Sequence, residues 1–167
     1  MPVNIILLQN KYRLLLVLLF PALFIPTSHA AENMKCEIAV QQANQQLIKQ
    51  GDKPVNDEAE VVSVLRSLNK NDLLPSRYVT TGQAKKLGWS GKDEDSLWNN
   101  WLLNLKAIGG DELIGKSPDS TFSWREADID SVRGFRSHKQ LIYSPQTQTR
   151  YLSTSDKQSR AEVKPCE

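Results

Sequence analysis

The stretch Ser123-Trp124-Arg125-Glu126-Ala127-Asp128-Ile129 marks the point at which the sequence changes from helical to strand-like patterns. Alternate side chains of a strand point to opposite faces, so Glu126 is expected to share one face with Trp124 and Asp128. Arg125 is expected to point to the other face. Three later runs, each bounded by turn-forming residues, also predict strands, and their short separations predict antiparallel hairpins: Lys139–Tyr143, Arg150–Ser153 and Arg160–Val163.

The first half of the chain predicts helices instead. Residues 34–50 have apolar side chains at helical spacing, and Gly51 ends this run. Its apolar positions are Ile38, Ala39, Ala43, Leu47 and Ile48. A second helix is expected to begin at a cap formed by Asn56 or Asp57. Its apolar face carries Val61, Val62, Val64, Leu65 and Leu68.

Two shorter helices are predicted between these and the strands. Thr80 and Gln83 have the spacing of a capping box, which begins a helix that runs to Leu87. A fourth helix is predicted over 95–105. Its core-facing residues would be Leu97, Trp101 and Leu105. The fold class is therefore α+β, with N-terminal helices packed on a C-terminal antiparallel β-sheet.

The first 30 residues have the pattern of a signal peptide. Lys11 and Arg13 precede a short apolar run, and Ser28 and Ala30 are the small residues that signal peptidase requires before its cut. Cleavage after Ala30 would remove residues 1–30 and place the mature chain in the periplasm or the medium. An uncleaved anchor is the alternative, but the run is shorter than the ~20 residues of a spanning helix, and no later segment is apolar enough to span.

The mature chain is expected to be electrically neutral. Without Lys11 and Arg13, the 21 basic residues fall to 19, which equals the number of acidic residues, 19. Overall charge therefore does not favour tight, unspecific nucleic-acid binding. An anionic ligand would have to be bound by a local cluster of basic side chains.

Two cysteines remain in the mature chain, Cys36 near its start and Cys166 next to its end. In an oxidising compartment a disulfide between them is expected. His138 is the only histidine left after cleavage. Neither a metal site nor a cofactor is expected, because these residues cannot make up a zinc ligand set.

Six short fragments follow one another along the chain in a definite order: Leu74-Pro75-Ser76-Arg77-Tyr78-Val79-Thr80, Ala84-Lys85-Lys86-Leu87-Gly88-Trp89, Ile108-Gly109-Gly110-Asp111, Trp124-Arg125-Glu126-Ala127-Asp128-Ile129, Gly134-Phe135-Arg136 and Tyr143-Ser144. In this order and at these intervals the set resembles barnase-type secreted bacterial ribonucleases, the guanyl-specific microbial ribonuclease family. The resemblance implies the microbial ribonuclease fold, with a ribonuclease domain over 56–167. Residues 31–55 would form an N-terminal helical extension outside the match.

The resemblance also implies a mechanism. In this family a carboxylate on the sheet deprotonates the ribose 2′-hydroxyl, and the alkoxide attacks the neighbouring phosphorus to give a 2′,3′-cyclic phosphate. Glu126 matches the base, and Arg136 matches an arginine that binds the phosphate; without the resemblance they would be interpreted as surface residues. The residues implied to bind substrate are Arg125, His138, Lys139 and Gln140.

The sequence departs from the family at several positions. Gln140 replaces a second active-site arginine, and Thr81 replaces a lysine early in the third helix. The loop between Asp111 and Trp124, which in the family binds guanine, is shorter here. A preference for guanine is therefore not expected.

The most consequential departure is at the general acid. Lys157 stands where the family has the histidine that protonates the leaving 5′-oxygen. An unperturbed lysine, with a pKa of about 10.4, donates a proton more slowly at neutral pH than an imidazole with a pKa of about 6.5. Three accounts are open: Lys157 acts with a lowered pKa, His138 has taken over, or the donor is missing.

Two functions of different classes follow. The first is an exported, monomeric endoribonuclease that cleaves single-stranded RNA by transesterification without a metal. The second is a catalytically impaired ribonuclease-fold module that binds RNA or a protein, such as an inhibitor of the barstar type. Glu126 and Arg136 favour the first function. The changes at Lys157, at Gln140 and in the guanine loop favour the second.

Overall fold

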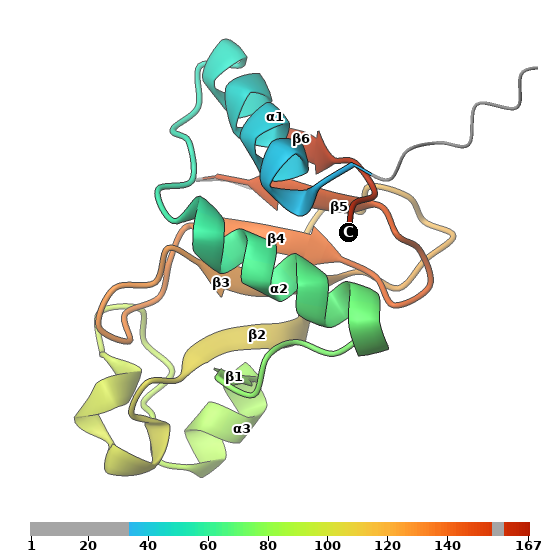
Figure 1. Cartoon of the computed structure of the whole chain (residues 1–167). Helices are drawn as coiled ribbons and strands as arrows, with labels where there is room; N and C mark the ends of the chain where they lie inside the picture. Colours follow the sequence, from blue (N-terminus) through green and yellow to red (C-terminus); the bar gives the residue numbers. More distant parts are fainter. Residues whose placement is uncertain (1–33, 155–158) are drawn as a thin grey trace, which may run out of the picture. The chain divides into compact units, whose positions relative to one another are not determined.

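The computed structural model describes residues 34–154 and 159–167 (Figure 1). The predicted signal peptide and Lys157 lie outside these residues. All of the described residues belong to one compact unit. The predicted boundary between residues 55 and 56 stays a prediction. No helix in the described ranges is long and apolar enough to cross a membrane.

The described strands form one sheet in which each strand pairs with the next in the sequence (Figure 1). They are β1 (Tyr78–Val79), β2 (Ala107–Glu112), β3 (Arg125–Ile129), β4 (Lys139–Tyr143), β5 (Arg150–Ser153) and β6 (Arg160–Val163). β1 and β2 are parallel, and all later pairs are antiparallel. The predicted bounds of β4, β5 and β6 are confirmed, whereas β1 and β2 were not predicted.

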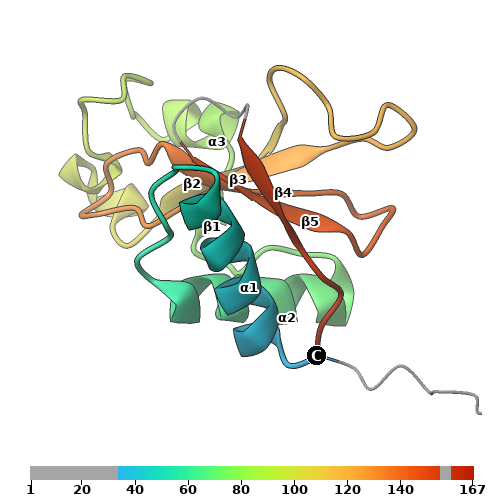
Figure 2. The ribbon, with the colours of Figure 1, turned by 90° about the horizontal axis from the view of Figure 1, so that it is seen from above.

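Two long helices cover one face of this sheet (Figures 1 and 2). They are α1 (Cys36–Lys49) and α2 (Glu58–Asn71), and their buried side chains share one core with those of the sheet. On the sheet side, that core consists of Tyr78, Ala107, Ala127, Ile129, Leu141, Tyr143, Leu152, Ala161 and Val163. The α+β class is therefore confirmed.

Side-chain caps set where two of the three α-helices in the described residues begin. Asp57 accepts a hydrogen bond from the Glu60 N–H at 2.8 Å, which selects it over Asn56 as the cap of α2. The capping box between Thr80 and Gln83 is confirmed at the start of α3 (Thr81–Lys86). These short-range signals could be predicted because each involves residues three apart.

The predicted apolar face of α1 is partly wrong. Ala39, Ala43 and Leu47 are buried, but Ile38 and Ile48 are exposed by 44% and 56%. The stripe that faces α2 and the sheet instead includes Cys36, Val40 and Asn44. Asn44 is buried because its side chain exchanges hydrogen bonds with the backbone of Val55.

The fourth predicted helix is wrong. The structure has two single 3₁₀ turns, η1 (Leu97–Asn99) and η2 (Trp101–Leu103). The side chain of Ser96 caps η1 and that of Asn100 caps η2, and the extended backbone of Asn100 separates the turns. Leu97 is buried as predicted, together with Leu103. The other two predicted core residues are exposed, Trp101 by 81% and Leu105 by 68%.

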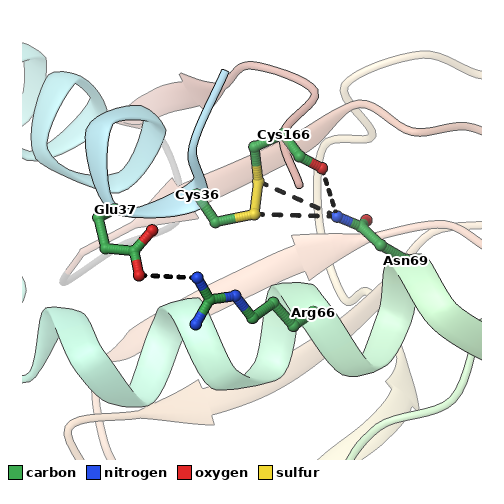
Figure 3. The surroundings of a disulfide bond; sticks show 5 residues. All are labelled: Cys36, Glu37, Arg66, Asn69 and Cys166. Atoms are coloured by element: carbon green, nitrogen blue, oxygen red, sulfur yellow. Dashed lines mark hydrogen bonds and ion pairs between the residues drawn. A yellow bond between two sulfur atoms is a disulfide. The ribbon is translucent and has the colours of Figure 1, made fainter. Parts of the chain in front are cut away.

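Both ends of the described chain are joined by a disulfide between Cys36 and Cys166 (Figure 3). The Asn69 side chain of α2 donates a hydrogen bond to the Cys166 carbonyl at 2.8 Å. An ion pair of 2.8 Å between Glu37 and Arg66 links α1 to α2 beside it. The disulfide therefore lies where α1, α2 and the segment after β6 meet.

The carboxylate of Asp130 fixes the start of the β3–β4 loop. It accepts hydrogen bonds from the backbone N–H groups of Asn56 and Asp57 at 2.7 and 2.8 Å. It also forms an ion pair of 2.7 Å with Lys139. Burial opposes ionisation of Asp130, but the hydrogen bonds from Asn56, Lys139 and Asp57 outweigh it and lower the pKa of the carboxyl.

We expect Asp130→Asn to lower the free energy of unfolding by about 1–3 kcal/mol at pH 7. A carboxyl with a lowered pKa in the folded state stabilises the fold above its ordinary pKa of 3.8. That contribution is lost as the pH falls through the folded pKa. Urea unfolding at pH 7 and at about pH 2 should therefore show a difference from the native protein that largely disappears in acid. The exposed Glu94→Gln serves as the control, and an equal loss in both variants would contradict the prediction.

Candidate functional site

The face of the sheet opposite α1 and α2 carries an unusual number of buried polar side chains. Cross-strand register places Asp128 of β3 opposite Gln140 of β4, and Gln140 opposite Ser153 of β5. Glu126 lies two residues before Asp128 and therefore points to the same face. All four side chains are nearly excluded from solvent. Buried polar groups of this kind are costly unless they bind one another or a ligand.

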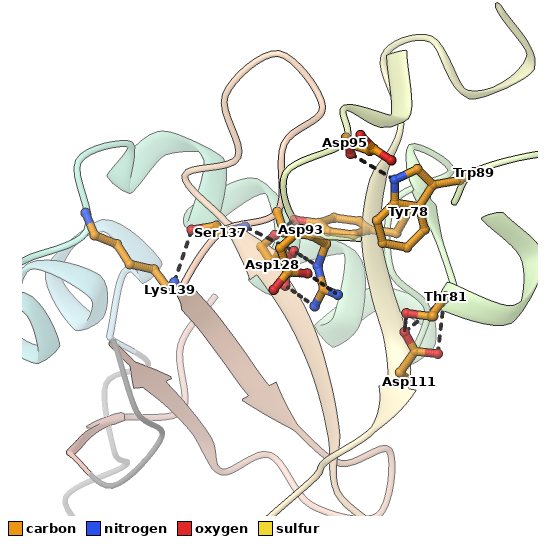
Figure 4. Close-up of polar contacts among 10 residues, drawn as sticks. Tyr78, Thr81, Trp89, Asp93, Asp95, Asp111, Asp128, Ser137 and Lys139 are labelled. Atoms are coloured by element: carbon orange, nitrogen blue, oxygen red, sulfur yellow. Dashed lines mark hydrogen bonds and ion pairs between the residues drawn. The ribbon is translucent and has the colours of Figure 1, made fainter. Parts of the chain in front are cut away.

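Arg136 reaches this face from the β3–β4 loop. Its guanidinium forms two hydrogen bonds with the Asp128 carboxylate, Nε to Oδ2 at 2.6 Å and Nη2 to Oδ1 at 3.2 Å. The Ser137 N–H donates to the same carboxylate at 3.2 Å (Figure 4). The Nη1 atom lies 3.7 Å from Asp93, an exposed carboxylate. Asp128 therefore fixes the guanidinium while one of its edges remains turned toward the surface.

These contacts stabilise the charged form of Arg136. Burial opposes the charged form, but the hydrogen bonds and the charge of Asp128 outweigh it and raise the pKa of Arg136. Glu126 is close enough to add to this electrostatic effect. The structure thus brings the two best-matched residues of the sequence, Glu126 and Arg136, into one charged cluster.

A close backbone approach positions the loop that carries Arg136. Gly134 has a φ of +76°, and its carbonyl accepts a hydrogen bond from the Leu97 N–H at 2.9 Å. A Cβ at this position would collide with the ring of Trp98 and with Ser96. Only glycine permits this approach without strain. The η1 turn and the β3–β4 loop are therefore packed together.

Thr81, which stands where the family has a lysine, makes a structural contact instead. The Thr81 N–H and hydroxyl both donate hydrogen bonds to the Asp111 carboxylate, at 2.9 and 2.8 Å (Figure 4). Asp111 lies on β2 directly opposite Glu126. This contact ties the start of α3 to the strand beside the site.

The four residues predicted to bind substrate lie in different surroundings. His138 is exposed, whereas Lys139 is engaged by Asp130. Gln140 is buried opposite Asp128, and its Oε1 has no hydrogen-bond partner among the described residues. Arg125 pairs with Tyr143 on the helix-covered face and donates to the Gly110 carbonyl at 3.2 Å. The structure therefore does not bring Arg125 to the side of the sheet that carries Glu126.

A cleft of about 670 Å³ opens beside Arg136. We call it the β3–β4 cleft, because most of its lining comes from that loop. His138 and Lys139 line it together with Arg136. No group of three or more His, Cys, Asp or Glu side chains in the described ranges is arranged to bind a metal ion.

Strand alternation predicted that Asp128 shares a face of the sheet with Glu126, but no sequence signal gave Asp128 a role. Its role, which is to fix Arg136, is visible only in the fold, because Arg136 reaches Asp128 from the β3–β4 loop. Asp93 was missed entirely. It lies far from β3 in the sequence, and no local pattern links the two.

The fold and the site together define a class: an α+β protein with a carboxylate and an arginine clustered on an antiparallel sheet. This pairing can provide a general base and a cation for a phosphate. No protein-family model matches the chain.

Three curated proteins named Ribonuclease are similar to this chain over 75 residues. The one from Heyndrickxia coagulans is 39% identical, and the match covers 42% of this chain and 66% of that protein. Those from Bacillus intermedius and Bacillus pumilus are each 39% identical, and the match covers 44% of each protein. The chain thus spans just under two thirds of the first relative and less than half of the other two. These relatives support a ribonuclease.

Proposed function

We propose that the protein is an exported endoribonuclease that cleaves single-stranded RNA by transesterification. The observation that carries this proposal is the cluster of Glu126, Arg136 and Asp128 on one face of the sheet. It combines a proton acceptor with a fixed cation, which the reaction requires at adjacent positions. The similarity to proteins named Ribonuclease supports the same substrate.

In the proposed reaction, the Glu126 carboxylate accepts the proton of a ribose 2′-hydroxyl. The resulting 2′-oxygen forms a bond to the adjacent phosphorus, and the bond from phosphorus to the 5′-oxygen of the next nucleotide breaks. The leaving 5′-oxygen takes a proton from a general acid. The products are a 2′,3′-cyclic phosphate and a free 5′-hydroxyl. No metal ion is needed, because side chains supply the base, the acid and the cation.

Arg136 contributes by stabilising the phosphate as negative charge builds up on its equatorial oxygens. A guanidinium fixed by a carboxylate needs little rearrangement when the substrate binds, so little binding energy is spent on ordering it. Asp128 acts only through Arg136 in this scheme and is a positioning residue.

Lys157 and His138 are the two candidates for the proton donor. Lys157 lies outside the described residues. His138 is exposed and lines the β3–β4 cleft next to Arg136. Loss of a general acid lowers a rate by about 10² to 10⁴, so a poor donor weakens the enzyme without abolishing it.

The direct test is to incubate the purified protein with single-stranded RNA in the presence of EDTA and to identify the new ends. Fragments ending in a 2′,3′-cyclic phosphate are expected, and their amount should not depend on added metal. Linear 3′-phosphates appearing without a cyclic precursor would contradict the mechanism. Absence of cleavage at any pH from about 5 to 9 would contradict the enzyme itself.

Export is part of the proposal and has its own test. The protein recovered from the periplasm or medium should begin near Ala31. A full-length mass in that fraction would contradict cleavage after Ala30. Recovery only from the cytoplasm would contradict export.

We expect Lys157→His to raise turnover on RNA by ten-fold or more, because an imidazole donates a proton faster at neutral pH. The rate should then show a bell-shaped dependence on pH, with a base on the acid limb and the new histidine on the alkaline limb. Initial rates on a short RNA between about pH 5 and 9 measure this. Two variants serve as controls. His138→Ala should be harmless unless His138 has taken over as the donor. If Lys157 instead acts with a lowered pKa, Lys157→His should gain little and Lys157→Ala should be strongly damaging. No gain from Lys157→His, with full activity in both alanine variants, would exclude both candidates.

A further inference from the structure

The β3–β4 cleft is lined by three separate parts of the chain. Lys53 and Asn56 come from the connection between α1 and α2, Thr154 follows β5, and the rest belongs to the β3–β4 loop and to Lys139 at the start of β4. Its volume of about 670 Å³ lies within the range of small-molecule sites. The cleft therefore has room for a nucleotide beyond the phosphate that Arg136 is proposed to bind.

Basic side chains outnumber acidic ones in this lining. Arg136 and Lys139 are already paired, with Asp128 and Asp130 respectively. Lys53 and Arg133 are exposed and form no ion pair in the described part of the chain. The chain thus places two unpaired cations in one cleft beside its proposed active site, although its mature form is expected to be neutral overall.

The segments that carry these two cations are fixed. The Arg133 backbone has a φ of +50°, and its carbonyl accepts a hydrogen bond from the Ser96 hydroxyl at 2.6 Å. The connection that carries Lys53 is tied to the same loop through the bond between Asn56 and Asp130. The cleft is therefore preformed, and little binding free energy is lost in ordering the protein backbone when a ligand binds.

The uncharged lining also fits a nucleotide. Thr154 is 1% exposed, and its hydroxyl oxygen has no hydrogen-bond partner among the described residues. The ring of Phe135 is exposed by 44%. An unpaired hydroxyl can bind a phosphate oxygen, and an exposed ring can stack on a base of any identity.

We propose that the β3–β4 cleft binds a second phosphodiester of the RNA strand through Lys53 and Arg133. The identification of the strand rests on the proposed function. Lys53 belongs to the predicted N-terminal extension, so the extension contributes directly to substrate binding. The protein should then favour oligonucleotides over dinucleotides, because only longer strands reach both the active site and the cleft.

The test measures binding without cleavage. Fluorescence anisotropy is recorded with a labelled 2′-deoxy dinucleotide and a 2′-deoxy pentanucleotide, which lack the attacking hydroxyl. In Lys53→Ala/Arg133→Ala the Kd for the pentanucleotide should rise ten-fold or more, and the Kd for the dinucleotide should not change. The slope of log Kd against log salt should fall by about 1.4, since each cation contributes about 0.7 on a single strand. Lys70→Ala/Lys164→Ala removes two exposed lysines outside the cleft and should leave both Kd values within two-fold.

Each other outcome overturns the inference. An unchanged Kd in the cleft variant, or an equal rise in the control variant, would show that Lys53 and Arg133 make no specific contact with the strand. If polyglutamate displaces the pentanucleotide as well as polyuridylate does at equal charge, the cleft binds acidic chains in general. Failure of the proposed function looks different: no RNA is cleaved, yet the length-dependent binding persists and is still lost in the cleft variant.

Discussion

Replacing Glu126 by Gln is expected to lower kcat for RNA cleavage by two or more orders of magnitude and to leave RNA affinity nearly unchanged. Glutamine keeps the shape of the side chain but cannot accept the 2′-hydroxyl proton. Single-turnover rates on a short RNA, together with the Kd of a 2′-deoxy analogue, separate the chemical step from binding. Because Glu126 is buried, the unfolding curve of the variant must be compared with that of the native protein.

Glu162→Gln is the matched control for this experiment. Glu162 is an exposed glutamate on β6, and its removal should leave kcat unchanged. Equal turnover of the Glu126 variant and the control would show that Glu126 is not the base. The match to the ribonuclease pattern would then fail at its best-preserved position.

Removing the disulfide is expected to have the largest effect on stability. Cys36 and Cys166 are 130 residues apart, and a bridge that closes so long a loop stabilises a fold by about 5 kcal/mol in the chain-entropy model. We expect Cys36→Ser/Cys166→Ser to lower the free energy of unfolding by that amount, less any strain in the bridge. Urea unfolding of both proteins measures the difference.

Unfolding in the presence of a reductant, which breaks the disulfide, provides the control. The reductant should shift the unfolding midpoint of the native protein toward that of the serine variant and should not affect the variant itself. Protein from the exported fraction should have a mass lower by two hydrogens than the fully reduced chain. Two free thiols in that fraction would contradict both the bridge and the argument from compartment.

Most of the fold could be predicted because its signals are local. The turn residues that bound β4, β5 and β6 lie next to them, and the caps of α2 and α3 act over three residues. β2 was missed because Gly109 and Gly110 give it no alternating apolar pattern, and its place comes from pairing with β3. The fourth helix failed because Leu97, Trp101 and Leu105 have helical spacing, whereas Ser96 and Asn100 cap two separate turns.

The site was predictable only in part, for a similar reason. Glu126 and Arg136 belong to two of the fragments that carry the resemblance, so the resemblance identified them. The partners of Arg136 come from β3 and from the segment before η1, and Lys53 reaches the cleft from another part of the chain. Contacts between distant segments leave no trace in local spacing. They become visible only when the sheet register and the β3–β4 loop are known.

The strictly sequential order of the sheet has a consequence for the order of folding. Every pair of neighbouring strands from β2 to β6 is close in sequence, so each hairpin can form with a small loss of chain entropy. The contact between α1 and β6 spans nearly the whole described chain and must close a far longer loop. We therefore expect α1 to dock late, onto a sheet that is already formed. The cluster of Glu126 and Arg136 would then be assembled before the extension brings Lys53 to its side.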